Sequence, residues 1–120
     1  TPYKLKHRLA ENTFDFYSSS GLIKTMSVGI LTLTLYLPDC HSLKEKRRRI
    51  SPILARLHKE FNISVVEYDH HDRWQSCTLK VACASRDGRD AEKILTQVIQ
   101  FTERHWPDCP LTDENIEILI

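Results

Sequence analysis

The period-two alternation of residues 28–37 constrains the fold of this chain more than any other feature. Leucines occupy the odd positions from Leu31 to Leu37, and Thr32 and Thr34 lie between them. Such alternation is typical of a strand that buries one face and leaves the other face polar. A chain of 120 residues, of which 41% are hydrophobic, is long enough to cover that face within one domain. The sequence therefore predicts a single domain built around a half-buried strand.

The segments after this strand alternate between helical and extended patterns. Apolar residues recur at helical spacing from Leu43 to Phe61, and extended patterns follow at 62–68 and 75–84. A second helical stripe begins after Asp87, which is the expected N-cap, and isoleucines alternate over 116–120. The order β-α-β-β-α-β is that of the ferredoxin-like fold. We predict a ferredoxin-like α+β domain, in which two helices cover one face of a four-stranded antiparallel sheet and the other face is open.

The first predicted helix has a capping signal at its start and a proline inside it. Ser42 is the expected N-cap, and Glu45 stands three residues later, which is capping-box spacing. Pro52 lacks the N–H that would bond to Arg48, and Ser51 before it would suit the start of a separate helix. We expect one helix, kinked or loosened near Arg48, rather than a short basic turn followed by a second helix.

The start of this helix carries a run of cations at residues 44–49. They divide between two sides of a helix, with Lys44, Arg47 and Arg48 on one side and Lys46 and Arg49 on the other. Cations are unfavourable at the positive end of a helix dipole, whereas phosphate is favourable there. We expect an anion, and RNA in particular, although a solvated helix face is the alternative. The candidate nucleic-acid-binding residues are this run and one cation of the open sheet face: Lys44, Lys46, Arg47, Arg48, Arg49 and Lys80.

Charge, hydropathy and cysteine content exclude several other classes of protein. The formal net charge is +1, so no global field attracts nucleic acid or membrane, and binding would depend on the local patch. No apolar run reaches the ~18 residues that a membrane span needs, and we expect no membrane partner. The four cysteines form no Cys-x-x-Cys pair, and we expect free thiols in a reducing cytoplasm.

The hairpin after the second predicted strand contains the one metal-like cluster of the sequence. Its candidate metal ligands are Asp69, His70 and Asp72, with Glu67 as a base, because carboxylates and imidazoles suit Zn, Mn or Fe. The alternative is a hairpin held by aspartate bonds to backbone N–H groups. No Ser-His-Asp order, Cys-His order or Gly-rich phosphate loop is present, so we expect no cofactor and favour a non-enzymatic protein.

Two stretches resemble the YlxP-like family of small bacterial proteins of unknown function. Residues 42–47, Ser-Leu-Lys-Glu-Lys-Arg, resemble the family's entry to its first helix. Within 64–75 the family's acids and its Trp-Gln pair recur at the same spacing: Glu67, Asp69, Asp72, Trp74 and Gln75. The resemblance covers residues 26–120, with Pro52 as a departure from it. It implies a ferredoxin-like fold, a cytoplasmic location and, from genes for translation-initiation and ribosome-maturation factors beside its own, work on RNA or the ribosome.

Residues 1–25 lie outside this resemblance. Met26 is the sole methionine, and strong patterning starts directly after it. The aromatic residues Phe14, Phe16 and Tyr17 would allow this segment to dock on the domain; a mobile tail, or a native start at Met26, are the alternatives. We expect an N-terminal extension that the domain does not need.

Three functional hypotheses follow from the sequence. The first is a non-enzymatic RNA- or ribosome-associated factor that binds phosphate through the basic helix start. The second is a protein-interaction module or homodimer that uses the open sheet face, where the few aromatic side chains, Tyr36 and Tyr68, do not favour stacking of bases. The third is a metal-dependent hydrolase built on the hairpin. We expect Trp74 to anchor the hairpin rather than to form a ligand platform.

Overall fold

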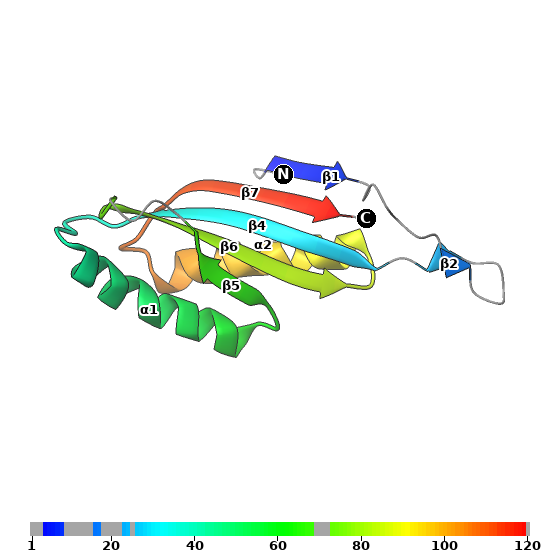
Figure 1. Cartoon of the computed structure of the whole chain (residues 1–120), viewed down its shortest axis with the longest axis horizontal. Helices are drawn as coiled ribbons and strands as arrows, with labels where there is room; N and C mark the ends of the chain where they lie inside the picture. The colour runs from blue at the N-terminus through cyan, green and yellow to red at the C-terminus, as the bar shows by residue number, and fades with distance from the viewer. Residues whose placement is uncertain (1–3, 9–15, 18–22, 25, 69–72, 120) are drawn as a thin grey trace.

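The computed structural model describes residues 4–8, 16–17, 23–24, 26–68 and 73–119. Its elements in chain order are β1 (Lys4–Arg8), β2 (Phe16–Tyr17), β3 (Ile23–Lys24), β4 (Ser27–Tyr36), α1 (Leu43–Glu60), β5 (Ser64–Glu67), β6 (Ser76–Ser85), α2 (Gly88–His105) and β7 (Leu111–Leu119). From β4 to β7 the order is β-α-β-β-α-β (Figure 1). The predicted ferredoxin-like α+β fold is confirmed.

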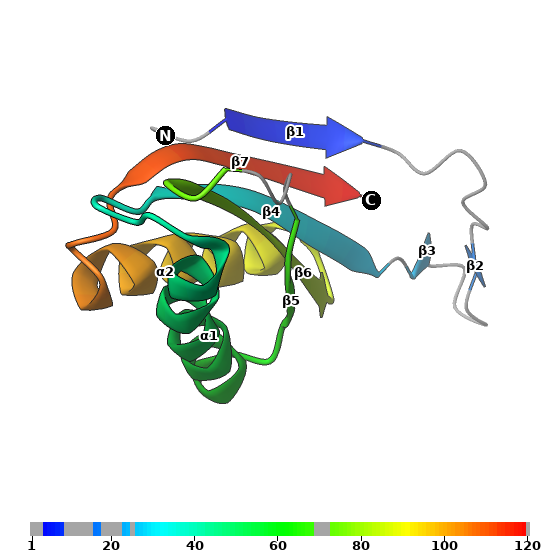
Figure 2. The same ribbon diagram turned by 60° about the vertical axis from the view of Figure 1, so that its left-hand side comes forward.

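The main sheet is centred on β4. Its strand order is β1-β7-β4-β6-β5, and within the four strands from β7 to β5 each adjacent pair is antiparallel. β4 pairs with β6 from Ser27 opposite Ser85 to Tyr36 opposite Ser76, and it pairs with β7 on its other side. Both helices lie on one face of the sheet (Figure 2). The open face predicted from the sequence is therefore present.

The sheet also contains an edge strand that the sequence pattern did not predict. β1 runs parallel to β7, with Lys4 opposite Asn115 and Arg8 opposite Leu119. β2 and β3 pair with each other in a separate two-stranded sheet. β1 thus covers the outer edge of β7, whose backbone groups would otherwise lack strand partners. That the domain folds without residues 1–25 stays a prediction.

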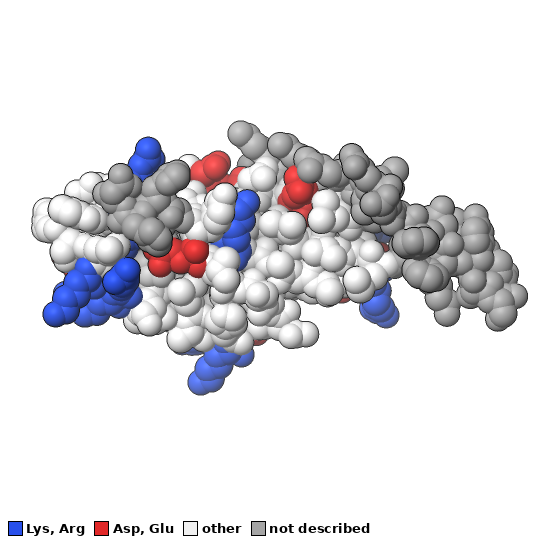
Figure 3. Space-filling model, viewed as in Figure 1, with Lys and Arg blue, Asp and Glu red and all other residues white. Residues whose placement is uncertain are grey.

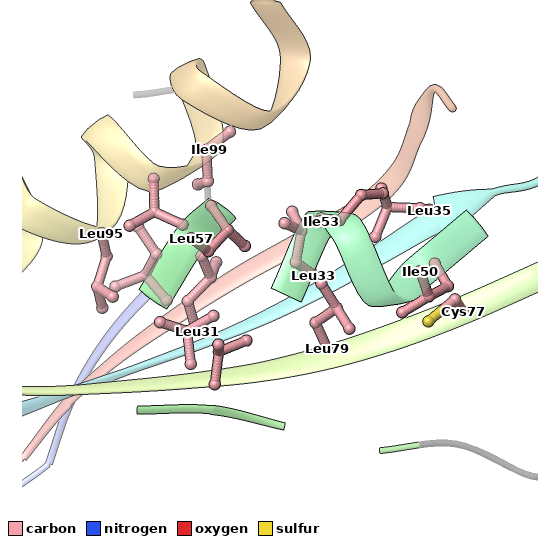
Figure 4. Close-up of a cluster of buried hydrophobic side chains, with 14 of the residues drawn as sticks. Leu31, Leu33, Leu35, Ile50, Ile53, Leu57, Cys77, Leu79, Leu95 and Ile99 are labelled. Atoms are coloured by element: carbon pink, nitrogen blue, oxygen red, sulfur yellow. The ribbon is translucent and has the colours of Figure 1, made fainter. Parts of the chain in front are cut away.

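The core lies between the sheet and the two helices. The leucines of β4 and the facing side chains of both helices are at most 1% exposed (Figure 4). Those that meet in this layer are Leu31, Leu33, Leu35, Ile50, Ile53, Leu57, Leu95 and Ile99. All four cysteines are buried and unbridged, which confirms the predicted free thiols. Among the described residues, neither helix is long and apolar enough to cross a bilayer.

Both helices begin at the predicted caps. The Ser42 Oγ accepts a hydrogen bond from the Glu45 N–H at 3.0 Å, and the Glu45 carboxylate accepts one from the His41 N–H at 3.1 Å. At the start of α2, the Asp87 Oδ1 accepts from the Asp90 N–H at 2.8 Å. These bonds satisfy N–H groups that have no partner inside a helix.

α1 is one helix in spite of Pro52. Pro52 cannot donate to the Arg48 carbonyl and its ring crowds that carbonyl, which together cost about 3 kcal/mol inside a helix. On the opposite side of the helix, Ile50, Ile53 and Leu57 are fully buried, and each contributes about 1.5–3 kcal/mol. The predicted single helix is confirmed because packing against the sheet outweighs the lost bond.

Gly29 in β4 marks the point at which α2 comes closest to the sheet. A Cβ at this position would lie 2.8 Å from the Leu95 Cδ1, 3.2 Å from the Ala91 Cβ and 3.4 Å from the Cys83 Sγ. Real Cβ atoms do not approach another atom to 2.8 Å, so a side chain here must push the Leu95 side chain aside and press on Ala91 of α2. The absence of a side chain at Gly29 therefore suits the close packing of α2 on β4.

We predict that Gly29→Val lowers the free energy of unfolding by about 1–3 kcal/mol, because it overpacks this contact. The measurement is urea denaturation followed by circular dichroism. Ala82→Val is the matched control, since Ala82 lies on the open face of β6 and should tolerate the change within about 0.5 kcal/mol. A Gly29→Val protein as stable as the unmodified chain would contradict this account of the α2 contact.

Candidate nucleic-acid interface

The first turns of α1 separate the basic run into exposed and inward-facing cations. Lys44, Arg47 and Arg48 are exposed and share one side of the helix, as predicted. Lys46 is fully buried, and Arg49 is half-buried. Figure 3 shows Lys and Arg side chains gathered at the end of the molecule where α1 begins. We call Lys44, Arg47 and Arg48 the α1 cation face, since a phosphate in solvent can reach these three.

Lys46 differs from the other cations of the run because its side chain is 0% exposed. The Lys46 Nζ donates to the Arg73 carbonyl at 2.9 Å and lies 3.6 Å from the Glu67 Oε1. A buried ammonium costs several kcal/mol unless it is paired in this way. Lys46 thus joins α1 to the ends of the β5–β6 hairpin, and a phosphate could reach it only by displacing these partners. That Lys46 binds nucleic acid stays a prediction, and its burial separates it from the exposed cations Lys44, Arg47 and Arg48.

The spacing of residues in the sequence indicates that Lys46 is buried. Lys46, Ile50, Ile53 and Leu57 are spaced by four, three and four residues, which is the spacing of one helix face. All four are buried in α1. Their spacing therefore indicates a buried lysine at the start of the apolar stripe.

The side chain of Arg49 also binds to other parts of the protein. Its guanidinium donates to the Pro38 carbonyl at 2.6 Å and to the Cys109 Sγ at 3.5 Å. These bonds hold α1 against the turn after β4 and the loop before β7. Burial and the charge of Asp108 raise the pKa of the Cys109 thiol, although Arg49 acts in the opposite direction. Arg49 is thus committed to protein partners, unlike the cations of the α1 cation face.

Lys80 lies in β6 on the open face of the sheet. Thr32 and Val66 are its neighbours in register, and its Nζ is 5.3 Å from the centre of the Tyr68 ring. The helices cover the opposite face (Figure 2). The structure therefore does not bring Lys80 together with the α1 cation face.

A hollow at the end of the sheet was not predicted from the sequence. It has a volume of about 370 Å³ and is lined by Tyr36, Arg73, Trp74, Gln75 and Ser76. Tyr36 and Trp74 are each 44% exposed. Trp74 therefore presents 44% of its surface to solvent, and the role of hairpin anchor that we expected for it stays a prediction. We call these five residues the aromatic hollow.

Two hydrogen bonds, one between backbone groups and one from the Lys46 side chain, place the aromatic hollow at the end of β4 and beside the first turns of α1. The Leu37 N–H donates to the Gln75 carbonyl at 2.8 Å, which fixes the hollow to the end of β4. The Arg73 carbonyl accepts from the Lys46 Nζ, and Arg47 of the α1 cation face follows Lys46 directly. The hollow forms because β4–β6 pairing sets Tyr36 opposite Ser76 and so brings it to the same hollow as Trp74 and Gln75, which the order of residues alone does not reveal.

The metal candidates Asp69, His70 and Asp72 lie outside the described residues. Glu67, which we expected to act as a base beside them, is 25% exposed and pairs with Lys46. Over residues 26–68 and 73–119, no three His, Cys, Asp or Glu side chains are grouped so that they could hold a metal ion. The metal hypothesis therefore stays a prediction.

We predict that Lys46→Met lowers the free energy of unfolding by about 3 kcal/mol, because it leaves the Glu67 carboxylate and the Arg73 carbonyl without the ammonium. The double variant Lys46→Met/Glu67→Gln should recover part of that loss. Urea denaturation measures both effects, and Lys44→Met, which is exposed, should change stability by less than about 0.5 kcal/mol. Equal effects of the Lys44 and Lys46 substitutions would contradict the buried contact.

Comparison with known proteins gives two findings. The family model described as "Protein of unknown function (DUF503)" matches residues 28–116, which extend from β4 into β7. "Uncharacterized protein YlxP" from Bacillus subtilis (strain 168) is 33% identical to this chain over 76 residues, which are 63% of this chain and 83% of that protein. The resemblance inferred from the motifs is confirmed, and both the α1 cation face and the aromatic hollow lie within the matched residues. The chain belongs to the DUF503 family, whose members are described as proteins of unknown function.

Proposed function

We propose that this protein is a non-enzymatic RNA-binding factor that associates with ribosomal particles through the α1 cation face. The observation that carries the proposal is a set of three exposed cations in the first turns of one helix, Lys44, Arg47 and Arg48. A phosphate backbone supplies the opposite charge at regular intervals, and most protein contacts to nucleic acid are made to phosphate and sugar.

The three cations differ from neighbouring cations in having no acidic partner among the residues that the structure describes. Lys46 contacts Glu67, and Arg56 contacts Glu60 at 2.9 Å. Within the described parts of the chain, no carboxylate lies within ion-pair distance of Lys44, Arg47 or Arg48. Each cation near a helix N-terminus costs about 0.3–1 kcal/mol. A bound phosphate would offset this cost, since the helix dipole and the side chains would then attract the same anion.

The chemistry of the buried thiols supports a binding function rather than cysteine-based catalysis. Burial raises the pKa of both Cys83 and Cys109. A raised pKa reduces the thiolate fraction, and the thiolate is the reactive nucleophile. Cys40 and Cys77 are 0% exposed. None of the four thiols therefore has the environment of an activated nucleophile.

We predict that the triple variant Lys44→Ala/Arg47→Ala/Arg48→Ala loses co-sedimentation with ribosomal particles at low salt. Its affinity for single-stranded RNA should also depend less on salt, with the slope of log K against log salt smaller by about 2, because ~0.7 counterions are released per phosphate contact. Fluorescence anisotropy at several salt concentrations measures this slope. Arg49 is left unchanged because it bonds to Pro38.

The control for this experiment removes the same charge from another helix. Arg89, Lys93 and Arg104 are exposed on α2, and their replacement by alanine should leave sedimentation and the salt slope unchanged. Sedimentation of the α1 variant at the level of the unmodified protein would contradict the proposal. Equal loss in both variants would show attraction by overall charge instead of a defined surface.

The open sheet face supports a second proposal, contact with a second copy of this chain. Val66 is 54% exposed and Tyr68 is 63% exposed, and both lie at the β5 edge of this face. Exposed large apolar side chains that are adjacent are typical of interaction surfaces.

For this second proposal we predict a dimer in size-exclusion chromatography with light scattering, and a monomer for Val66→Glu/Tyr68→Glu. Arg89→Glu/Lys93→Glu on α2 is the control, and it should leave the mass unchanged. A monomeric mass for the unmodified chain at high concentration would contradict the dimer and would leave the RNA proposal unaffected.

A further inference from the structure

The aromatic hollow joins two exposed aromatic side chains from separate segments. Tyr36 is the last residue of β4, and Trp74 precedes β6 by two residues. Each of the two side chains is 44% exposed. A single exposed aromatic side chain is common on protein surfaces, but these two lie together. Here both line one hollow of about 370 Å³, which is within the ~300–1,000 Å³ of small-ligand sites. The hollow is therefore large enough for a flat ring.

The other lining residues define the chemistry that the hollow fits. Arg73 supplies a guanidinium that can stack on a ring or bind a phosphate, and Gln75 and Ser76 supply hydrogen-bonding groups. Aromatic faces with an arginine and short polar groups are the usual means of holding an unpaired nucleobase. A base inside a duplex is stacked on its neighbours and cannot enter such a hollow.

The aromatic hollow lies next to the α1 cation face. The Arg73 carbonyl accepts from the buried Lys46 Nζ at 2.9 Å, so one wall of the hollow is fixed to the turn of α1 that also carries Arg47. The end of β4, the start of α1 and the start of β6 lie at the same end of the molecule (Figure 1), where the cations gather (Figure 3). One short strand of RNA can thus contact both surfaces.

We propose that the aromatic hollow binds one unpaired base of a single-stranded RNA, while the neighbouring phosphates lie along the α1 cation face. The inference rests on the proposed RNA-binding function and narrows its ligand from RNA in general to single strands. Trp74 and Tyr36 supply the stacking surfaces. The Lys46 contact holds these surfaces beside the cations.

The test uses the full chain and a single-stranded RNA of about ten nucleotides, a length that covers one small binding domain. Trp74→Leu and Tyr36→Leu should each raise the Kd by about 5- to 150-fold in fluorescence anisotropy, which is the value of one stacked base. Trp74→Phe should restore most of the affinity. Tyr68→Leu is the matched control, because Tyr68 is exposed but lies outside the hollow, and its Kd should not change.

Tryptophan fluorescence gives a second measurement that does not depend on any destabilised variant. The chain has two tryptophans, and the other one, Trp106, is half-buried against Phe101 with ring centres 5.9 Å apart. RNA should quench the unmodified protein, and this quenching should disappear in Trp74→Phe. Unaltered fluorescence of the unmodified protein at saturating RNA would overturn the proposal.

The outcomes separate this inference from the function on which it rests. Loss of affinity in the triple α1 variant with no change in Trp74→Leu would keep the RNA-binding function and overturn the hollow. Equal affinity for the same RNA as a duplex would also overturn the hollow, because no unpaired base would be available. Full affinity in the α1 variant would overturn the proposed function itself.

Discussion

Burial of one side of β4 is the constraint on which the other features depend. β4 pairs with β6 and β7, so it cannot move without disturbing both neighbours. Its leucines are 0% exposed and lie under both helices, and at Gly29 the side chains of Leu95 and Ala91 in α2 pack directly on the strand backbone. Because one face is fixed in this way, period two leaves the other face open along the whole strand. The same strand ends at Tyr36, which places an aromatic ring at the rim of the sheet.

Lys46 determines how the first helix meets the hairpin. Its ammonium is enclosed by protein and contacts both the Arg73 carbonyl and Glu67. Removing Glu67 from this arrangement would be costly, since the Lys46 ammonium is fully buried and would lose its counter-charge. Lys46 therefore connects α1 to the β5–β6 hairpin, although it lies within a basic run. This connection sets the position of the α1 cation face relative to Trp74. Geometry of this type is what distinguishes a binding surface from a merely charged helix.

Local patterns predicted the fold well, and long-range contacts account for what they missed. Alternation identified β4, and side-chain chemistry identified Ser42 and Asp87 as caps, because both signals lie within a few residues of sequence. The first half of β7 carries Thr112, Asp113 and Glu114, which have no apolar alternation, so its pairing with β4 was not predicted. We placed Lys46 with the exposed cations because we considered only its residue type, whereas its side chain is buried. The aromatic hollow requires the β4–β6 register, which a single sequence does not state.

The edge strand β1 hinders the addition of another strand to the outer edge of β7. β1 occupies the outer edge of β7 and is joined to β4 by the residues between Arg8 and Ser27. A tether of this kind keeps its segment at an effective concentration of roughly millimolar beside its site. A free peptide at micromolar concentration would need an intrinsic affinity about a thousandfold higher to replace it. The molecule thus protects the outer edge of β7 with an attached strand, and β1 and the short strand β5 form the two edges of the sheet.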